Sequence, residues 1–172
     1  LLPGRLTSWK GQEMFIEALN LVNQELKQEV FNAVILGDAQ GRDVYKKKLL
    51  RLVEQYRLNQ QVKFVDHCKH MPLAYKIANL VVSSSIEPEA FGRVSVEAQS
   101  MEKIIIASNI GGSRETIIND KTGLLFEAGN AKSLSQKIIE ALKLDDSTLK
   151  IMGNEGRKNV IKKFNIEKMC FS

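Results

Sequence analysis

Short apolar runs that alternate with stretches of helical periodicity constrain the fold of this chain more than any other feature of its sequence. The apolar runs cover residues 31–36, 62–65, 80–82, 104–107 and 123–126. Runs of this length and composition favour buried strands of a parallel sheet. Residues 1–6 are expected to form a further strand or the end of an interdomain linker. Strands that alternate with helices predict an α/β fold, here a Rossmann-like, doubly wound parallel sheet with right-handed crossovers.

Apolar side chains at helical spacing predict the helices that separate and follow these strands. The expected helices cover residues 12–26, 44–58, 71–78, 131–142 and 147–163, with another starting near residue 91 and a helical turn over 115–118. Pro72 suits the first turn of its helix, and Ser147 is the expected cap of the last one. The residues expected to face the core from the last two helices are Leu134, Ile138, Ala141 and Leu142, and then Leu149, Met152 and Ile161.

The composition predicts one globular domain over residues 1–172. Of these residues 44% are hydrophobic and 26% are charged, which is ordinary for a single domain with its own core. Cys68 and Cys170 lie far apart and outside any C-x-x-C pattern, so neither a disulfide framework nor a zinc site is expected. No apolar run approaches a membrane-spanning length, and no signal peptide is visible. Because the chain begins with Leu1 rather than Met, we interpret it as a fragment without its N-terminal half.

The net charge of +5 is compatible with several kinds of partner. An anionic small molecule or peripheral contact with an anionic membrane would suit it. A lysine-rich solvated surface explains the same charge without any partner. Nucleic acid is disfavoured, because the aromatic residues are few and are not interleaved with arginine.

Residues 83–101, with the sequence SSSIEPEAFGRVSVEAQSM, are the most informative stretch for function. They follow a predicted buried strand, and ligands of open parallel sheets lie outside the carboxyl ends of the strands. A helix that starts near Phe91 offers unpaired N–H groups and partial positive charge to phosphate or sugar oxygens. Glu89 precedes this helix and Glu97 lies inside it. The stretch therefore predicts a site with two carboxylates beside free backbone N–H groups.

This stretch resembles the E-x7-E signature of the retaining, nucleotide-sugar-dependent glycosyltransferases of the large family 4 group, whose fold is the two-domain GT-B type. Other motifs of that family follow in its order along nearly the whole chain. They are G-R-L…K-G at residues 4–11, L-G-D at 36–38, G-G-S-R-E at 111–115 and G-L-L at 123–125. The resemblance implies one half of a GT-B fold, namely the C-terminal domain that binds the nucleotide sugar.

The resemblance also implies roles for the charged residues. Arg5 and Lys10 match the cations that hold the donor diphosphate, and such cations neutralise a pyrophosphate leaving group as its bond to the sugar breaks. Glu97 matches the acid that accepts from the ribose hydroxyls of the nucleotide. Glu89 matches the acid that contacts the donor sugar. Glu87 is a rival for Glu89 on position alone, but the family spacing selects Glu89.

Backbone groups complete the implied donor site. Phe91, Gly92, Arg93 and Val94 match positions that offer N–H groups to the donor, although Phe91 is equally suited to anchoring the core. Gly37 would let the nucleotide pack against a strand end, or it is an ordinary turn glycine. Gly111, Gly112 and Glu115 are expected to be structural.

No metal or other cofactor is expected, since donor binding in GT-B enzymes usually does not require one. His67 and His70 flank Cys68 and Lys69, but no further histidine or cysteine is placed near them to complete a metal site. Arg114 replaces a proline of the family motif, and Glu102 and Ile104 stand where the family commonly has glycine and proline. These departures affect donor preference more than donor binding.

The function that these features imply is transfer of a hexosyl group from a nucleoside-diphosphate sugar to an acceptor hydroxyl with retention of configuration. The acceptor, a sugar or a lipid-linked molecule, would bind through an N-terminal domain, and the expected location is the cytoplasm or the inner face of its membrane. Two alternatives remain open. One is another GT-B activity, such as a nucleotide-sugar epimerase; a phosphorylase would need a lysine for pyridoxal phosphate, and no lysine stands in a suitable context. The other is a non-catalytic basic docking module.

Overall fold

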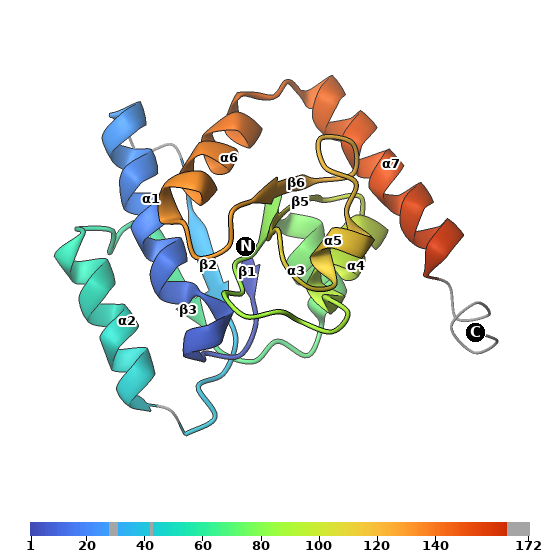
Figure 1. Cartoon of the computed structure of the whole chain (residues 1–172). Coiled ribbons are helices and arrows are strands. Elements are labelled where there is room, and N and C mark those ends of the chain that lie inside the picture. The colour runs from blue at the N-terminus through green and yellow to red at the C-terminus, as the bar shows by residue number, and fades with distance from the viewer. Residues whose placement is uncertain (28–30, 42, 165–172) are drawn as a thin grey trace.

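The computed structural model describes residues 1–27, 31–41 and 43–164, and its helices cover both faces of a parallel sheet (Figure 1). The elements in chain order are β1 (Leu2–Pro3), the 3-10 turn η1 (Ser8–Lys10), α1 (Gln12–Leu26), β2 (Ala33–Leu36), α2 (Asp43–Gln55), β3 (Val62–Val65), α3 (Met71–Ile77), β4 (Leu80–Ser83), α4 (Arg93–Ser100), β5 (Ile104–Ser108), α5 (Ser113–Thr116), β6 (Leu124–Phe126), α6 (Ala131–Lys143) and α7 (Asp146–Lys163). The α/β class predicted from the alternation of apolar runs and helical stretches is confirmed.

The strands form two three-stranded parallel sheets, β1-β2-β3 and β4-β5-β6, which meet at the start of the chain. The main-chain nitrogen of Leu1 donates to the oxygen of Leu80 at 2.9 Å, and the N–H of Val82 donates to the oxygen of Leu1 at 2.8 Å. β1 therefore lies between β2 and β4, which gives the order 3-2-1-4-5-6 of a doubly wound sheet. The order reverses between β1 and β4, and ligands of such sheets bind outside the strand ends at this point.

Alternate side chains of the central strands enter two different cores. Val82, Ile104 and Ile106 belong to the larger core, which is completed by α1, α2 and α6. Ile105 and Val81 point to the opposite face of the sheet, where they pack with side chains from α3 and α4. Successive side chains of a strand point to opposite faces of the sheet, so continuous apolar runs are what a sheet covered on both faces requires.

Several helix boundaries and faces differ from the sequence prediction. α2 ends at Gln55 rather than at residue 58, because Arg57 adopts a left-handed φ of 57°. The helix expected near residue 91 begins at Arg93, after Gly92. In α6, Leu142 is 38% exposed, although it was expected to face the core. Its neighbours Leu134, Ile138 and Ala141 are buried as predicted.

The last helix corrects two further expectations. Its N-cap is Asp145, whose side chain accepts from the N–H of Thr148 at 2.9 Å, so Ser147 is not the cap. Ile161 is 57% exposed, whereas the buried face of α7 is formed by Met152, Gly153, Gly156, Asn159 and Val160. Glycines on this face allow α7 to approach the end of α4 closely, and a Cβ on Gly153 would lie 2.4 Å from the oxygen of Glu102.

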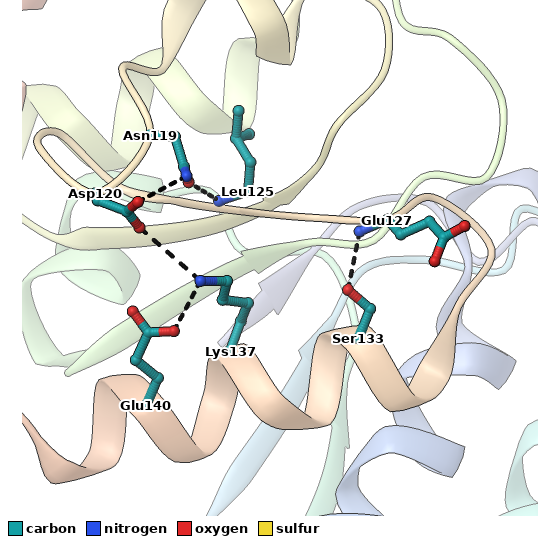
Figure 2. Close-up of polar contacts among 7 residues, drawn as sticks. All are labelled: Asn119, Asp120, Leu125, Glu127, Ser133, Lys137 and Glu140. Carbon is teal, nitrogen blue, oxygen red and sulfur yellow. Dashed lines mark hydrogen bonds and ion pairs between the residues drawn. The ribbon is translucent and has the colours of Figure 1, made fainter.

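Polar contacts tie the edge strand β6 to the loop before it, and tie the segments on either side of β6 to α6 (Figure 2). The Asn119 Oδ1 accepts from a main-chain N–H of β6 at 2.7 Å, and the N–H of Glu127 donates to Ser133 Oγ at 3.0 Å. The Lys137 ammonium, on α6, lies 3.9 Å from a carboxylate oxygen of Asp120. These contacts lie on the far side of β5 from β4 and hold the outer part of the fold.

Candidate functional site

A cleft of about 500 Å³ lies where the chain leaves the carboxyl ends of β1 to β4. Segments that follow each of these strands line it, together with residues of α3 and α4. The residues singled out from the sequence that line the cleft are Arg5, Lys10, Gly37, Glu89, Arg93, Val94 and Glu97. The cationic motif with Arg5 and Lys10 thus meets the acidic motif with Glu89 and Glu97 at the point where the strand order reverses, although the two are far apart in the sequence.

Lys10 and Glu89 form an ion pair across the cleft. The ammonium nitrogen lies 2.8 Å from Glu89 Oε1, and the two side chains are only 14% and 19% exposed. The Ser85 hydroxyl donates to the same carboxylate oxygen. The Lys10 ammonium also lies over the ring of Trp9, 4.5 Å from its centroid. This lysine is held between a carboxylate and an aromatic face, so its position is set before any ligand arrives.

The turn that carries Lys10 is tied to the loop that carries Glu89. Ser84 Oγ donates to the main-chain oxygen of Lys10 at 2.9 Å, and the N–H of Ile86 donates to the oxygen of Trp9 at 2.8 Å. Gly11 has a φ of 70°, and a Cβ there would lie 1.9 Å from the oxygen of Ser84. The two segments pack so closely that only glycine fits at this position.

The Gly111-Gly112 pair supports the acidic loop from behind. The N–H of Gly112 donates to the oxygen of Glu89 at 2.8 Å. A Cβ on Gly111 would lie 2.6 Å from that oxygen, and one on Gly112 would lie 2.5 Å from the main chain of Phe91. The pair is structural, as expected, and it holds the backbone of the predicted site. Arg114, which replaces the proline of the family motif, donates to the oxygen of Asn109 at 2.9 Å instead.

Glu97 is oriented by a tyrosine that the sequence analysis did not single out. The hydroxyl of Tyr75, on α3, donates to Glu97 Oε2 at 2.7 Å. Tyr75 is 2% exposed. Burial, followed by the hydrogen bond to Glu97, raises the pKa of Tyr75 above its usual range. The phenol therefore stays protonated at neutral pH and remains a donor to the carboxylate.

The predicted backbone contacts fall into two groups. Arg93 and Val94, in the first turn of α4, line the cleft, and so does Gly37, whose Cβ would lie 1.9 Å from the oxygen of Gly4. Phe91 and Gly92 are not among the residues that line the cleft. The Phe91 ring packs edge-on against Phe164, with ring centroids 5.6 Å apart, so its side chain anchors α7.

Sequence reasoning missed several residues that line the cleft, among them Trp9, Asp38, Cys68 and Tyr75. His67, which the sequence analysis considered only as a metal ligand, lines it too. His67 and Cys68 follow a predicted strand, so the rule that ligands lie at strand ends could have identified them. No local signal distinguishes Tyr75, because its role depends on how α3 packs beside α4. The other cysteine, Cys170, lies outside the described residues.

Within residues 1–27, 31–41 and 43–164, no group of three or more histidine, cysteine, aspartate or glutamate side chains could hold a metal ion. None of the helices that the structure describes is long and apolar enough to cross a membrane.

The fold and the position of the cleft define a Rossmann-like α/β domain of the kind found in GT-B glycosyltransferases. The chain belongs to the glycosyl transferases group 1 family, which matches it over residues 1–159. It is 36% identical, over 162 residues, to the capsular polysaccharide biosynthesis glycosyltransferase CapM of Staphylococcus aureus. That match covers 94% of this chain and 41% of CapM, so the chain spans less than half the length of this relative.

Solved structures show the same likeness. A glycosyltransferase of Rickettsia africae superposes with a TM-score of 0.91 at 35% identity, over 98% of this chain and 44% of that one. HepE of Anabaena, solved with UDP-glucose, gives a TM-score of 0.89 at 27% identity, over 98% of this chain and 45% of that one. The C-terminal domain of a Francisella tularensis group 1 protein gives 0.82 at 27% identity, over 96% of this chain and 84% of that domain.

Proposed function

We propose that this chain is the donor-binding half of a retaining glycosyltransferase, which transfers a hexosyl group from a nucleoside-diphosphate sugar to an acceptor hydroxyl. The observation that carries the proposal is the meeting of Arg5, Lys10, Glu89 and Glu97 in one cleft at the carboxyl ends of the strands. The structural relative from Anabaena that was solved with UDP-glucose supports a nucleotide sugar as the ligand class.

The cations would bind and stabilise the diphosphate. Arg5 can present a guanidinium fork, and Lys10 a point charge. When the bond between the sugar and the phosphate breaks, the nucleoside diphosphate leaves with the bonding electron pair and gains negative charge. The acceptor oxygen forms the new bond to the sugar, and the proton of its hydroxyl passes to a phosphate oxygen of the departing nucleoside diphosphate. Fixed cations stabilise this charge without having to reorganise, which is the main source of catalysis that we propose.

The acids would orient the two ends of the donor. Tyr75 occupies Oε2 of Glu97, which leaves Oε1 to accept from the ribose hydroxyls. Glu89 shares Lys10 with the incoming diphosphate, so it would lie between the phosphates and the sugar. We assign no nucleophile to the chain. We also propose that donor binding needs no metal ion, because Arg5 and Lys10 supply the positive charge.

The acceptor and the cellular setting complete the proposal. The acceptor would be a sugar or a lipid-linked molecule held largely by an N-terminal domain, in the cytoplasm or at the inner face of the membrane. Residues 1–172 alone would then bind nucleotide weakly and transfer little or no sugar. Appreciable turnover by this chain without a second domain would contradict that part of the proposal.

Calorimetry and thermal shift with a panel of UDP-, GDP- and ADP-sugars test the donor site directly. We expect one nucleotide class to bind, with and without EDTA, and to stabilise the domain by about 2.7 kcal/mol at a hundredfold excess over its dissociation constant. Arg5→Ala should weaken binding about tenfold or more, since a charged hydrogen bond contributes about 1.5–3 kcal/mol. Arg51→Ala, on the exposed surface of α2, is the matched control. Absence of binding across the panel would refute the donor-site proposal.

A further inference from the structure

A second hollow, of about 620 Å³, lies between the turn before α1 and the first turns of α2. The residues that line it are Thr7, Ser8, Trp9, Val44, Tyr45 and Lys48. Trp9 also lines the cleft described above, so the two hollows share one wall. The proposed donor contacts do not use the second hollow.

The lining combines aromatic surface with hydrogen-bonding groups. Trp9 and Tyr45 supply flat apolar faces, and Val44 is 85% exposed at its edge. Ser8 supplies an exposed hydroxyl. Thr7 is only 7% exposed and its Oγ1 is buried, so the accessible hydroxyl of the lining is that of Ser8. Ligand pockets that are apolar with a few convergent polar groups commonly bind small molecules, and a sugar ring offers both apolar C–H faces and hydroxyls.

The charges around the hollow favour a neutral ligand. Lys48 is its one cationic lining residue, and its ammonium pairs with the Glu13 carboxylate on α1. Tyr45 donates to Gln12 Oε1 at 3.3 Å, which fixes the ring at the wall of the hollow. Because the lysine is already neutralised, the lining has no surplus charge with which to attract a phosphate or an anionic lipid head group.

We propose that this second hollow is a subsite for the sugar ring of a carbohydrate acceptor. The inference rests on the proposed function, because Trp9 places the hollow directly beside the cleft assigned to the donor. The Lys10 ammonium over the Trp9 ring, at 4.5 Å from its centroid, holds the indole between the two hollows. This domain thus contributes to acceptor binding as well as to donor binding, and Trp9 is the contact common to both.

Tryptophan fluorescence tests the subsite, because Trp9 is the single tryptophan of the chain. The probes are the methyl α- and β-glycosides of glucose, galactose, mannose and N-acetylglucosamine, each titrated to about 100 mM with and without saturating nucleotide. We expect at least one glycoside to change the Trp9 emission saturably. A panel in which no glycoside gives a saturable change overturns the subsite.

Two matched variants locate the binding. Val44→Asp places a charge on the exposed edge of the hollow and should weaken glycoside binding about tenfold. Leu50→Asp introduces the same charge on the same helix, at a residue that is 46% exposed and does not line the hollow. It should change glycoside affinity less than twofold. Both variants should bind nucleotide as the unmodified chain does. Equal glycoside affinity in all three proteins overturns the subsite.

The outcomes separate this inference from the proposed function. Nucleotide binding without glycoside binding leaves the donor site intact and removes the acceptor subsite. Glycoside binding without nucleotide binding removes the donor site, and with it the acceptor role. If sedimentation shows a dimer that Val44→Asp dissociates, the hollow is an interface between copies of the chain, and the subsite is overturned.

Discussion

Lys10 and Glu89 neutralise each other in a position where both side chains are largely shielded from water, at 14% and 19% exposed. A pair of this kind is not a strong source of stability, because desolvation opposes the attraction between the charges. Its consequence is positional, since each charge fixes where the other lies. A ligand that brings its own negative charge to Lys10 must then compete with Glu89.

Glu89→Gln tests that competition. Removing the negative charge frees the Lys10 ammonium for a diphosphate, so we expect affinity for the free nucleoside diphosphate to rise. The affinity for the corresponding nucleotide sugar should fall relative to the affinity for the free nucleoside diphosphate, because the proposed contact with the sugar is lost. Calorimetry of both ligands measures this ratio. Lys10→Ala is the opposing control and should weaken both ligands. A variant that loses both ligands equally would contradict the assignment of Glu89 to the sugar.

The Tyr75–Glu97 hydrogen bond is a second contact between side chains that line the cleft. Tyr75→Phe removes the donor and leaves the ring in place. We expect the free energy of unfolding to fall by about 1 kcal/mol, less than the about 1.5–3 kcal/mol of a shielded charged hydrogen bond, because Glu97 is solvent-exposed. Nucleotide affinity should fall as well, since Glu97 is no longer oriented. Tyr56→Phe, away from the cleft, is the control for both measurements. A change in stability without any change in nucleotide affinity would argue against a positioning role for Tyr75.

The connections between elements place the site more than the elements themselves do. The turn after β1 and the loop after β4 are joined through Ser84, and the loop after β5 supports the loop after β4 through its paired glycines. Each of these contacts joins main chain to main chain or a short side chain to main chain. Such close approaches leave no room for a Cβ, so glycine is required at both contacts.

Gly11→Ala probes the first of these contacts. The added Cβ would lie 1.9 Å from the oxygen of Ser84, so the turn that carries Lys10 must move away from the loop that carries Glu89. Gly41→Ala is the matched control, because Gly41 has a similar φ of 79° and nothing lies within 4 Å of its Cβ position. The control should lose only the cost of the left-handed backbone, about 1–2 kcal/mol.

We expect Gly11→Ala to lose clearly more stability than Gly41→Ala in urea denaturation, and to lose nucleotide binding. Equal destabilisation of the two variants would show that the turn and the loop can separate without cost.

The cap of α7 gives the fold a dependence on acid pH. Hydrogen bonds from the Ser147 hydroxyl and then from Thr148 lower the pKa of Asp145 to about 2. Since this value lies below that of an unfolded aspartate, the contribution is complete above about pH 4 and is lost as the pH falls toward 2. Asp145→Asn keeps a capping side chain but cannot ionise. Between pH 5 and 2, the unmodified chain should therefore lose more stability than the variant. If the two proteins lost stability equally between pH 5 and 2, the proposed contribution of the ionised Asp145 cap would be contradicted.

The larger of the two cores joins the two halves of the sheet. The larger core contains Ile35 from the first three-stranded sheet and Ile106 from the second, together with side chains of α1, α2 and α6. The two halves therefore share this larger core, whereas the smaller core on the opposite face takes its buried side chains from residues 75–117. The cleft at the reversal of the strand order exists only when both halves are joined.

This shared core leads us to expect a single cooperative unfolding transition. Far-UV circular dichroism reports the helices of both halves, and Trp9 fluorescence reports the junction between them. The two signals should give the same midpoint and slope in urea, as two-state unfolding requires. An earlier transition in fluorescence would indicate that the two halves separate before the helices unfold.

Much of the fold could be predicted from local pattern. Apolar runs predicted the strands, helical spacing predicted the helices, and the position of charged residues after strands predicted which segments line the cleft. Boundaries were less certain, because a helix end depends on a single residue such as Arg57, whose left-handed conformation has no signal in the pattern. The prediction that Leu142 and Ile161 face the core was wrong, because near a helix end the packing of neighbouring elements decides which side chains are buried.

The sequence by itself therefore determined the class of fold and the motifs that mark the cleft, because hydrophobic periodicity and chain order are local properties. Only the tertiary structure decided that Tyr75 orients Glu97, that Trp9 stands between two hollows and that paired glycines support the acidic loop. These contacts join distant segments, as Ser84 and Lys10 are joined across 74 residues. Such distances are set by the packing of all the layers together, and no short stretch of sequence contains them.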